Sequence, residues 1–185
     1  DGEKPVVVAQ WYGHIDMDIL AWKAAQIAKW YDDALLVIES NTADRERNAN
    51  TEGDHFATLI EEIADYYPNL YQRSVGSEEV SDKKEMKWGF QTNKLTKTQI
   101  IDNMLASVED KLWDEPDEAC YNELRIYERR DDGSLGNIRG KDNHDDIVMS
   151  TAIALWISMS DMEKPSWRIT YKRTKEQEGI SEASF

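Results

Sequence analysis

The spacing of apolar and polar positions changes along the chain and outlines its first elements. Residues 5–12 (PVVVAQWY) are mostly β-branched or aromatic and are followed by Gly13, which predicts a strand. From 20 to 31 the apolar residues recur at helical spacing, and Asp16 or Asp18 precedes them as a capping residue. The chain therefore opens with a strand and a helix.

The segment 34–41 (ALLVIESN) is the most apolar strand candidate in the chain. Its apolar run does not alternate with polar residues, which is typical of a parallel strand covered on both faces. A helix over 54–67, ended by Pro68, and a short strand over 69–75 follow. Strands that alternate with helices predict an α/β sheet with right-handed crossovers, in which ligands bind at the carboxyl ends of the parallel strands.

The second half of the chain predicts a polar loop, two helices, a hairpin, an apolar last helix and a polar tail. The loop is 76–87, and the two helices are 97–113, which follows Thr96, and 117–124. The hairpin strands are 124–130 and 135–139, the last helix is 147–159 and the tail is 172–185. The hairpin is indicated by Asp132-Gly133, a dipeptide that favours tight turns. A length of 185 residues fits one domain, which we assign to 1–171, with 172–185 as its tail.

Composition narrows the class of protein. The chain has 37 acidic and 22 basic residues and a net charge of -15, so any binding to nucleic acid must be local. Its apolar runs are too short to cross a bilayer, and we expect no membrane partner. The single cysteine, Cys120, cannot form an internal disulfide; it indicates a reducing compartment and is expected to be a small buried thiol.

The candidate chemistry begins with two adjacent carboxylates, Asp145 and Asp146, directly before the apolar helix 147–159. One interpretation is that an acid caps this helix by accepting hydrogen bonds from the N–H groups of its first turn. One acid suffices for a cap, and a second acid beside a low-dielectric wall needs a proton or a cation to offset the repulsion. The pair therefore indicates either a helix cap or half of a metal site.

Glu39 ends the apolar strand 34–41 and is expected at the edge of the sheet where ligands bind. The alternative is an acid that only leaves the core where the strand ends. Together with Asp145 and Asp146, it offers hard oxygen ligands from two separate elements, which suit Mg²⁺ or Mn²⁺. Two such ions can activate a water and stabilise the leaving oxygen in phosphodiester cleavage.

Four motifs, taken in order, carry a resemblance to a known family. They are G-H-I-D-M-D-I-L at 13–20, L-V-I-E-S-N at 36–41, W-G-F-Q-T-N at 88–93 and H-D-D-I-V-M-S-T-A-I-A at 144–154. From residue 6 to residue 160 the chain resembles the C-terminal nuclease domain of tailed-phage terminase large subunits. The resemblance implies a ribonuclease-H-like α/β fold, a mixed sheet flanked by helices. It also implies a Mg²⁺- or Mn²⁺-dependent endonuclease that cuts concatemeric viral double-stranded DNA by two-metal hydrolysis.

The resemblance also assigns the metal ligands. Glu39 matches the acid at the end of the fourth strand and Asp145 the acid at the start of the last helix, with Asp146 as a supporting or alternative ligand. The first acid of the family lies on a strand that precedes the equivalent of 6–11, so it is expected upstream, and 1–185 alone is expected to be weak or inactive. The implied partners are double-stranded DNA, an upstream ATPase domain, the portal and the small terminase subunit, in the cytoplasm of a bacterial host.

Other polar residues near the acid pair are candidates for contacts with DNA. His144 could bind metal, orient a water or contact phosphate, although a solvated histidine is the alternative. The basic residues of the hairpin region are the candidates for phosphate contacts, with cross-strand ion pairs to Glu128, Asp131 and Asp132 as the alternative. These basic residues are Arg125, Arg129, Arg130, Arg139 and Lys141.

Two rival functions remain at this stage. One is another ribonuclease-H-like enzyme, such as a resolvase or an integrase, which the motifs at 13–20 and 36–41 disfavour. The other is a non-catalytic docking module of the packaging motor, whose acidic surface meets a basic partner and whose carboxylates are only structural.

Overall fold

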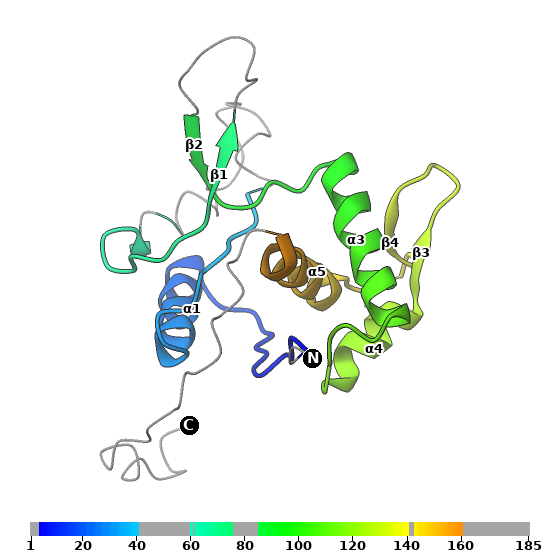
Figure 1. The fold of residues 1–185 in the computed structure, drawn as a ribbon, viewed down its shortest axis with the longest axis horizontal. Helices are drawn as coiled ribbons and strands as arrows, with labels where there is room; N and C mark the ends of the chain where they lie inside the picture. Colours follow the sequence, from blue (N-terminus) through cyan, green and yellow to red (C-terminus); the bar gives the residue numbers. More distant parts are fainter. Residues whose placement is uncertain (1–3, 41–59, 61, 76–84, 141–142, 161–185) are drawn as a thin grey trace.

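The computed structural model describes residues 4–40, 60, 62–75, 85–140 and 143–160. Its elements are two short antiparallel hairpins and, within the described residues, four named helices (Figure 1). In chain order they are α1 (Met17–Trp30), β1 (Gln72–Val75), β2 (Glu85–Trp88), α3 (Lys94–Glu109), α4 (Glu118–Arg125), β3 (Tyr127–Arg129), β4 (Leu135–Asn137) and α5 (Asp146–Ser160). This confirms a mixed α/β chain, while the ribonuclease-H-like arrangement stays a prediction.

Helix α5 is the centre of the larger core, as its apolar sequence predicts. Val148 and Ala152 are completely buried, and α5 packs against α3, where Ile100 and Met104 are also completely buried. Figure 1 shows α5 with α3, α4 and the β3–β4 hairpin on one side and α1 on the other. Because α5 is held in this way, the residues at its start have a fixed place in the fold.

The expected parallel strand 34–41 is present only as isolated bridges. Leu36 pairs in parallel with Leu70, and Glu39 pairs in parallel with Phe90. The direction of pairing was therefore predicted correctly, but no regular strand forms over the described part, 34–40. The strand predicted at 5–12 is likewise reduced to one bridge, between Val6 and Asp114.

The main chain of 34–40 explains why these bridges stay isolated. Its hydrogen bonds are divided between two segments: the Leu36 N–H and carbonyl bond to Asn69 and Tyr71, whereas the Ile38 carbonyl and the Ser40 N–H bond to Phe90, both at 2.8 Å. The main-chain groups of Leu35 and Val37, which point the other way, make no hydrogen bond with any residue that the structure describes. Leu35 and Val37 therefore form an open edge within the described part of the chain.

The elements β2 and α3 have other boundaries than predicted. Residues 85–87, expected in a loop, belong to β2, which pairs with β1 in the register Gln72↔Trp88. This contact is between segments, and the charge-rich composition of the stretch did not reveal it. Helix α3 starts at Lys94 rather than at 97 because Asn93 caps it, and it ends at Glu109 rather than at 113. The Asn93 side chain accepts from the N–H groups of Leu95 and Thr96, and the Thr96 hydroxyl accepts from the Asn93 N–H.

The other named elements form where they were predicted, but β1 starts at Gln72 rather than at 69 and β3 at Tyr127 rather than at 124. Helix α4 begins after Asp117, whose side chain accepts from the Ala119 N–H, and the β3–β4 hairpin turns at Gly133 with a φ of +75°. Asp16 lies at the N-cap position of α1 but makes no side-chain capping bond. None of the described helices is long and apolar enough to span a bilayer. The predictions for 54–59, 61, 76–84, Lys141 and 172–185 lie outside the described residues.

Candidate active site

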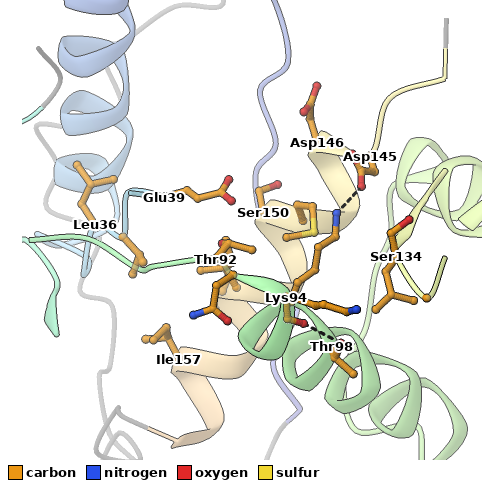
Figure 2. A pocket seen from close by; sticks show the side chains of 18 of the residues that line it. Leu36, Glu39, Thr92, Lys94, Thr98, Ser134, Asp145, Asp146, Ser150 and Ile157 are labelled. Atoms are coloured by element: carbon orange, nitrogen blue, oxygen red, sulfur yellow. Dashed lines mark hydrogen bonds and ion pairs between the residues drawn. The ribbon is translucent and has the colours of Figure 1, made fainter. Parts of the chain in front are cut away.

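A cavity of about 1090 Å³ separates the segment 35–39 from helix α5. Its other walls are the start of α3 and the turn of the β3–β4 hairpin (Figure 2). All three predicted carboxylates line it: Glu39, Asp145 and Asp146. The fold therefore brings acids that are more than a hundred positions apart in the sequence to one cavity.

Glu39 enters the cavity because the segment 34–40 is anchored on both sides of it. The carbonyl of Ile38 and the N–H of Ser40 both bond to Phe90, and Ser40 is completely buried. Glu39 itself is exposed, and Figure 2 shows its carboxylate directed towards Ser150 of α5. The interpretation of Glu39 as an acid at a ligand-binding edge is consistent with this position.

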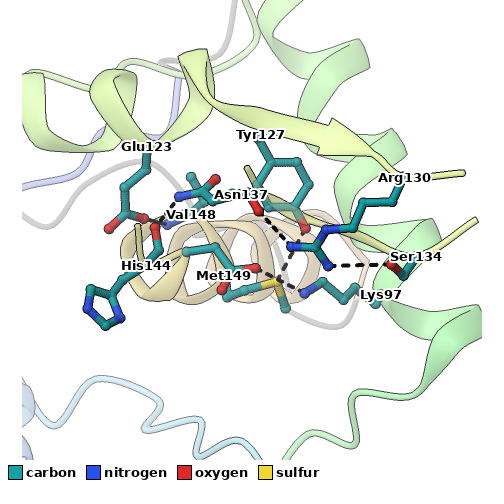
Figure 3. A network of polar contacts seen from close by, with 10 residues as sticks. Lys97, Glu123, Tyr127, Arg130, Ser134, Asn137, His144, Val148 and Met149 are labelled. Carbon is teal, nitrogen blue, oxygen red and sulfur yellow. Dashed lines mark hydrogen bonds and ion pairs between the residues drawn. The ribbon is translucent and has the colours of Figure 1, made fainter. Parts of the chain in front are cut away.

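The start of α5 is capped by a residue that sequence reasoning missed. Glu123 of α4 accepts a hydrogen bond from the Val148 N–H at 2.9 Å (Figure 3). Burial raises the pKa of Glu123, the N–H groups of Val148 and Ile147 oppose this, and the charges of Asp146 and Asp145 add to the rise. Because Glu123 serves these two N–H groups, the carboxylates of Asp145 and Asp146 are not needed for them.

The carboxylate of Asp145 is paired with a cation. The ammonium nitrogen of Lys97 lies 3.0 Å from Asp145 Oδ2, and the side chains of Lys97 and Asp145 are 26% and 29% exposed. The same nitrogen lies 5.9 Å from the centre of the Tyr127 ring. Burial, and then the charge of Asp145, raise the pKa of the Tyr127 hydroxyl. The expectation that the acid pair needs a compensating cation is thus met for Asp145 by Lys97.

Lys97 was also missed, although the sequence held a signal for it. The first turn of α3 contains two lysines, Lys94 and Lys97, and no acid. Cations at a helix start oppose the helix dipole and are unfavourable there. Lysines in that position indicate a nearby negative charge, and in this fold both line the cavity that holds the acids.

His144 is placed apart from the acids that it precedes. Its carbonyl accepts a hydrogen bond from the Asn137 side chain, while its imidazole is exposed and is not part of the cavity wall as described. Figure 3 shows the ring directed away from the contacts of Tyr127 and Arg130. The structure thus gives His144 a main-chain anchor, and a catalytic part for its ring stays a prediction.

The basic candidates have different surroundings. Arg130 is partly buried, and its guanidinium binds the Asn137 carbonyl at 2.6 Å and the Ser134 hydroxyl at 3.4 Å, which ties the hairpin together. Arg129 and Arg139 are exposed, and each lies almost 4 Å from a single carboxylate, at 3.8 and 3.9 Å. Exposed ion pairs at such long distances contribute little to the stability of the fold, so the side chains of Arg129 and Arg139 can turn to a ligand at little cost.

Arg139 makes its pair with Asp132, one of the cross-strand partners considered as an alternative to DNA contact. Arg129 pairs instead with Asp102 of α3. Arg125, also exposed, contacts Asn122 within its own helix at 3.2 Å. Ion pairing and DNA contact therefore both remain open to this group.

The donor set suits a hard divalent ion only in part. The three predicted carboxylates and Asp132 line one cavity, and carboxylates are the ligand chemistry that Mg²⁺ and Mn²⁺ prefer. However, no three His, Cys, Asp or Glu side chains among the described residues are grouped closely enough to hold a metal ion. The acids have the right chemistry, but the described chain does not preassemble a complete site.

Comparisons with known proteins point to one solved structure. No family model and no curated protein matches the sequence. The structural match is the large terminase nuclease from thermophilic phage G20c, crystallised with bound cobalt, at 22% sequence identity and a TM-score of 0.49. The match covers 77% of this chain and spans 62% of the length of that chain. The chain is therefore similar to a phage large terminase nuclease, the kind of protein that its motifs resemble.

Proposed function

We propose that this chain is the nuclease domain of a phage terminase large subunit and cuts double-stranded viral DNA with the help of divalent ions. The observation that carries the proposal is one cavity lined by Glu39, Asp145 and Asp146 together with Lys94 and Lys97. Acids to hold metal and lysines to meet phosphate are the two groups that phosphodiester cleavage requires.

In this proposal each acid has its own part. Glu39 and Asp145 hold the metal ions, and Asp146, exposed in the first turn of α5, supports them. Bound Mg²⁺ or Mn²⁺ would supply an activated water and charge to stabilise the leaving oxygen. Glu123 keeps the start of α5 in place, so that Asp145 faces the cavity rather than the end of its own helix.

A further carboxylate would complete the site. The edge formed by Leu35 and Val37 lines the cavity and has main-chain groups with no partner among the described residues. A strand that paired with this edge would run past Glu39, along the cavity. We propose that an upstream strand of the same polypeptide occupies it and brings the first acid of the family, as the resemblance implies.

The DNA would lie across the cavity and the β3–β4 hairpin. Arg125, Arg129 and Arg139 are exposed on and beside this hairpin, and Lys94 lies in the cavity wall. Contacts of such residues with phosphates would fix the position of the duplex without reading its sequence. The ATPase domain, the portal and the small terminase subunit would act on the same DNA in the host cytoplasm.

A non-catalytic docking module is the second candidate. The observation in its favour is the Lys97–Asp145 pair, which already neutralises one of the acids, in a site where no three ligands are assembled among the described residues. In that case the carboxylates would be structural, and the acidic surface would meet a basic partner.

Cleavage of supercoiled plasmid separates the two functions. The protein, extended upstream through one further strand, is incubated with plasmid and Mg²⁺ or Mn²⁺, and nicked and linear products are measured. We expect metal-dependent cleavage that Glu39→Gln and Asp145→Asn abolish. The matched control is Asp132→Asn, which removes a carboxylate from the hairpin side of the same cavity and should leave most of the activity. Metal-independent cleavage, or equal losses in all three variants, would refute the nuclease assignment.

A further inference from the structure

The cation next to Asp145 in this structure is part of the protein itself. Lys97 reaches from the first turn of α3 to the carboxylate at the start of α5, over 3.0 Å. Both side chains line the cavity, so their pair lies where a metal ligand is needed. Asp145 cannot give its full negative charge to a divalent ion while the ammonium group stays at this distance.

We propose that Lys97 is a built-in counter-ion of the metal site, which must leave Asp145 when a divalent ion is bound there. The proposal rests on the metal-dependent function proposed above and adds a role for a residue outside the carboxylate set. In the metal-free protein Lys97 holds the acidic site together. Once a divalent ion has replaced it at Asp145, the ammonium group of Lys97 is available to the DNA.

The surroundings of Lys97 suit such an exchange. Its side chain is 26% exposed, and the pair with Asp145 is not sealed in the core, so separating the two charges exposes them to water. Figure 3 shows Lys97 beside Met149 and below the Tyr127 ring, a position in which the aromatic face and the cavity both accept a cation. Lys97 can therefore move without leaving an unpaired charge buried.

After its displacement from Asp145, Lys97 would stay on the side of the cavity where phosphate is expected. Lys94 precedes Lys97 in the first turn of α3 and lines the same cavity, so the two ammonium groups would form a positive wall facing the acids. A scissile phosphate between the two walls would meet metal on one side and lysine on the other. The displaced cation would thus favour substrate binding at the moment when the metal site is filled.

The structure also supplies a control for the effect of net charge on Mn²⁺ affinity. Lys94 and Lys97 carry the same charge, belong to the same turn of α3 and line the same cavity. Only Lys97 lies within ion-pair distance of Asp145 among the described residues. An effect of net charge would appear in both variants, whereas exchange at Asp145 would appear only for Lys97.

The test measures Mn²⁺ binding directly, without any assay of cleavage. The free Mn²⁺ in solutions of this chain is measured by its electron paramagnetic resonance signal for the wild type, Lys97→Gln, Lys97→Arg and Lys94→Gln. We expect Lys97→Gln to bind Mn²⁺ about fivefold more tightly, the upper end of the effect of a partly exposed ion pair. Lys97→Arg, which keeps the cation, and Lys94→Gln should both stay close to the wild type.

Introducing the same change into an Asp145→Asn background tests the pair itself. There Lys97→Gln should have no effect on Mn²⁺ affinity, because the carboxylate that the lysine competes for is gone. Circular dichroism of each variant confirms that the helices are intact, so that a loss of structure is not mistaken for a loss of binding. An effect of Lys97→Gln that persisted in the Asp145→Asn background would refute the exchange.

The outcomes separate this inference from the proposed function. The exchange is wrong if the wild type binds Mn²⁺ and Lys97→Gln binds it no more tightly. It is also wrong if Lys94→Gln gains as much Mn²⁺ affinity as Lys97→Gln. In both cases the metal-dependent function stands. If Lys97→Gln binds Mn²⁺ and the wild type does not, the exchange is supported. If no form of this chain binds Mn²⁺ even at millimolar concentrations, the exchange is refuted, and the metal-dependent function is decided separately by plasmid cleavage with the upstream-extended protein.

Discussion

The carboxylate of Glu123 accepts a hydrogen bond from the Val148 N–H, and so a residue of α4 caps the helix that carries the two candidate metal ligands. This contact shows that the cap of α5 does not depend on the side chains of the acid pair, while their part in a metal site stays a prediction. Asp145 and Asp146 stand at a helix start, where acids commonly serve as caps, yet that task is performed by Glu123. Asp145 is paired with Lys97 instead and lies in the wall of the cavity.

The first prediction concerns the stability supplied by this cap. We expect Glu123→Ala to lower the free energy of unfolding by about 1 to 2 kcal/mol, the usual cost of removing a capping acceptor. Glu123→Gln, which keeps an acceptor oxygen, should cost less. Urea unfolding at neutral pH measures both, and Glu118→Ala in the exposed first turn of the same helix is the control.

The stability linked to the ionisation of Glu123 depends on pH with a definite sign. Because the pKa of Glu123 is raised in the folded state, the folded protein binds its proton more readily than the unfolded chain does. The associated stability is fully present below the ordinary value of 4.5 and is lost as the pH rises through the raised value. Unfolding titrations from pH 4 upward should therefore show a decline in stability that is smaller in Glu123→Gln. An equal decline in both proteins would assign the effect to other groups.

The second prediction concerns Cys120, which is completely buried. Burial, and then the charge of Glu115, raise the pKa of its thiol to about 12, so it stays protonated and unreactive at neutral pH in the folded protein. We expect an aromatic disulfide reagent to label this thiol only as fast as the structure opens, and at once in denaturant. Rapid labelling under native conditions would show that the α4–α5 contact opens readily.

The third prediction compares the two adjacent acids in an upstream-extended protein. Asp145 lies just before α5, partly buried, whereas Asp146 is exposed in the first turn of the helix, so we do not expect the two acids to serve the metal ions equally. We expect Asp145→Asn to lower kcat by about a hundredfold or more and Asp146→Asn by about tenfold, in the range known for supporting groups. A single-turnover plasmid assay under matched metal concentrations makes the comparison, and a larger loss for Asp146→Asn would reverse the two roles.

The fourth prediction concerns the incomplete edge at Leu35 and Val37. A chain that begins one strand further upstream should bind Mg²⁺ or Mn²⁺ more tightly and cut DNA faster than 1–185, because a further carboxylate would join the ligand set. Calorimetric titration and plasmid cleavage of the two forms provide the measurement. Full activity in the shorter form would mean that the residues present already complete the site.

The fifth prediction concerns the exposed arginines of the hairpin region. We expect the double variant Arg129→Ala, Arg139→Ala to weaken binding to duplex DNA. The slope of log affinity against log salt should fall by about 1.8, the value for two lost phosphate contacts. Lys29→Ala on α1, a similarly exposed cation with one carboxylate at 3.4 Å, is the control and should change neither quantity. Fluorescence anisotropy at several salt concentrations provides both values.

The helices and the hairpin were determined by the sequence itself. The apolar faces of α1, α3 and α5 recur at helical spacing, and Asp132-Gly133 directs the chain into its turn at a φ of +75° for Gly133. These features depend on residues close together along the chain, so their local pattern suffices to predict them. The burial of α5 follows as well, because a helix that is apolar on nearly all sides has to lie within the core.

The assignment of roles in the site was decided by the tertiary structure. Lys97 meets Asp145 across 48 positions, and Glu123 meets Val148 across 25, so neither pair follows from a local pattern. The β2 pairing and the isolated bridges of 34–40 likewise depend on which segments lie next to each other. The sequence alone placed acids at a strand end and at a helix start, because side-chain type and position are local properties. Which side chain caps α5 and which carboxylate meets a cation depend on the neighbours that only the folded chain provides.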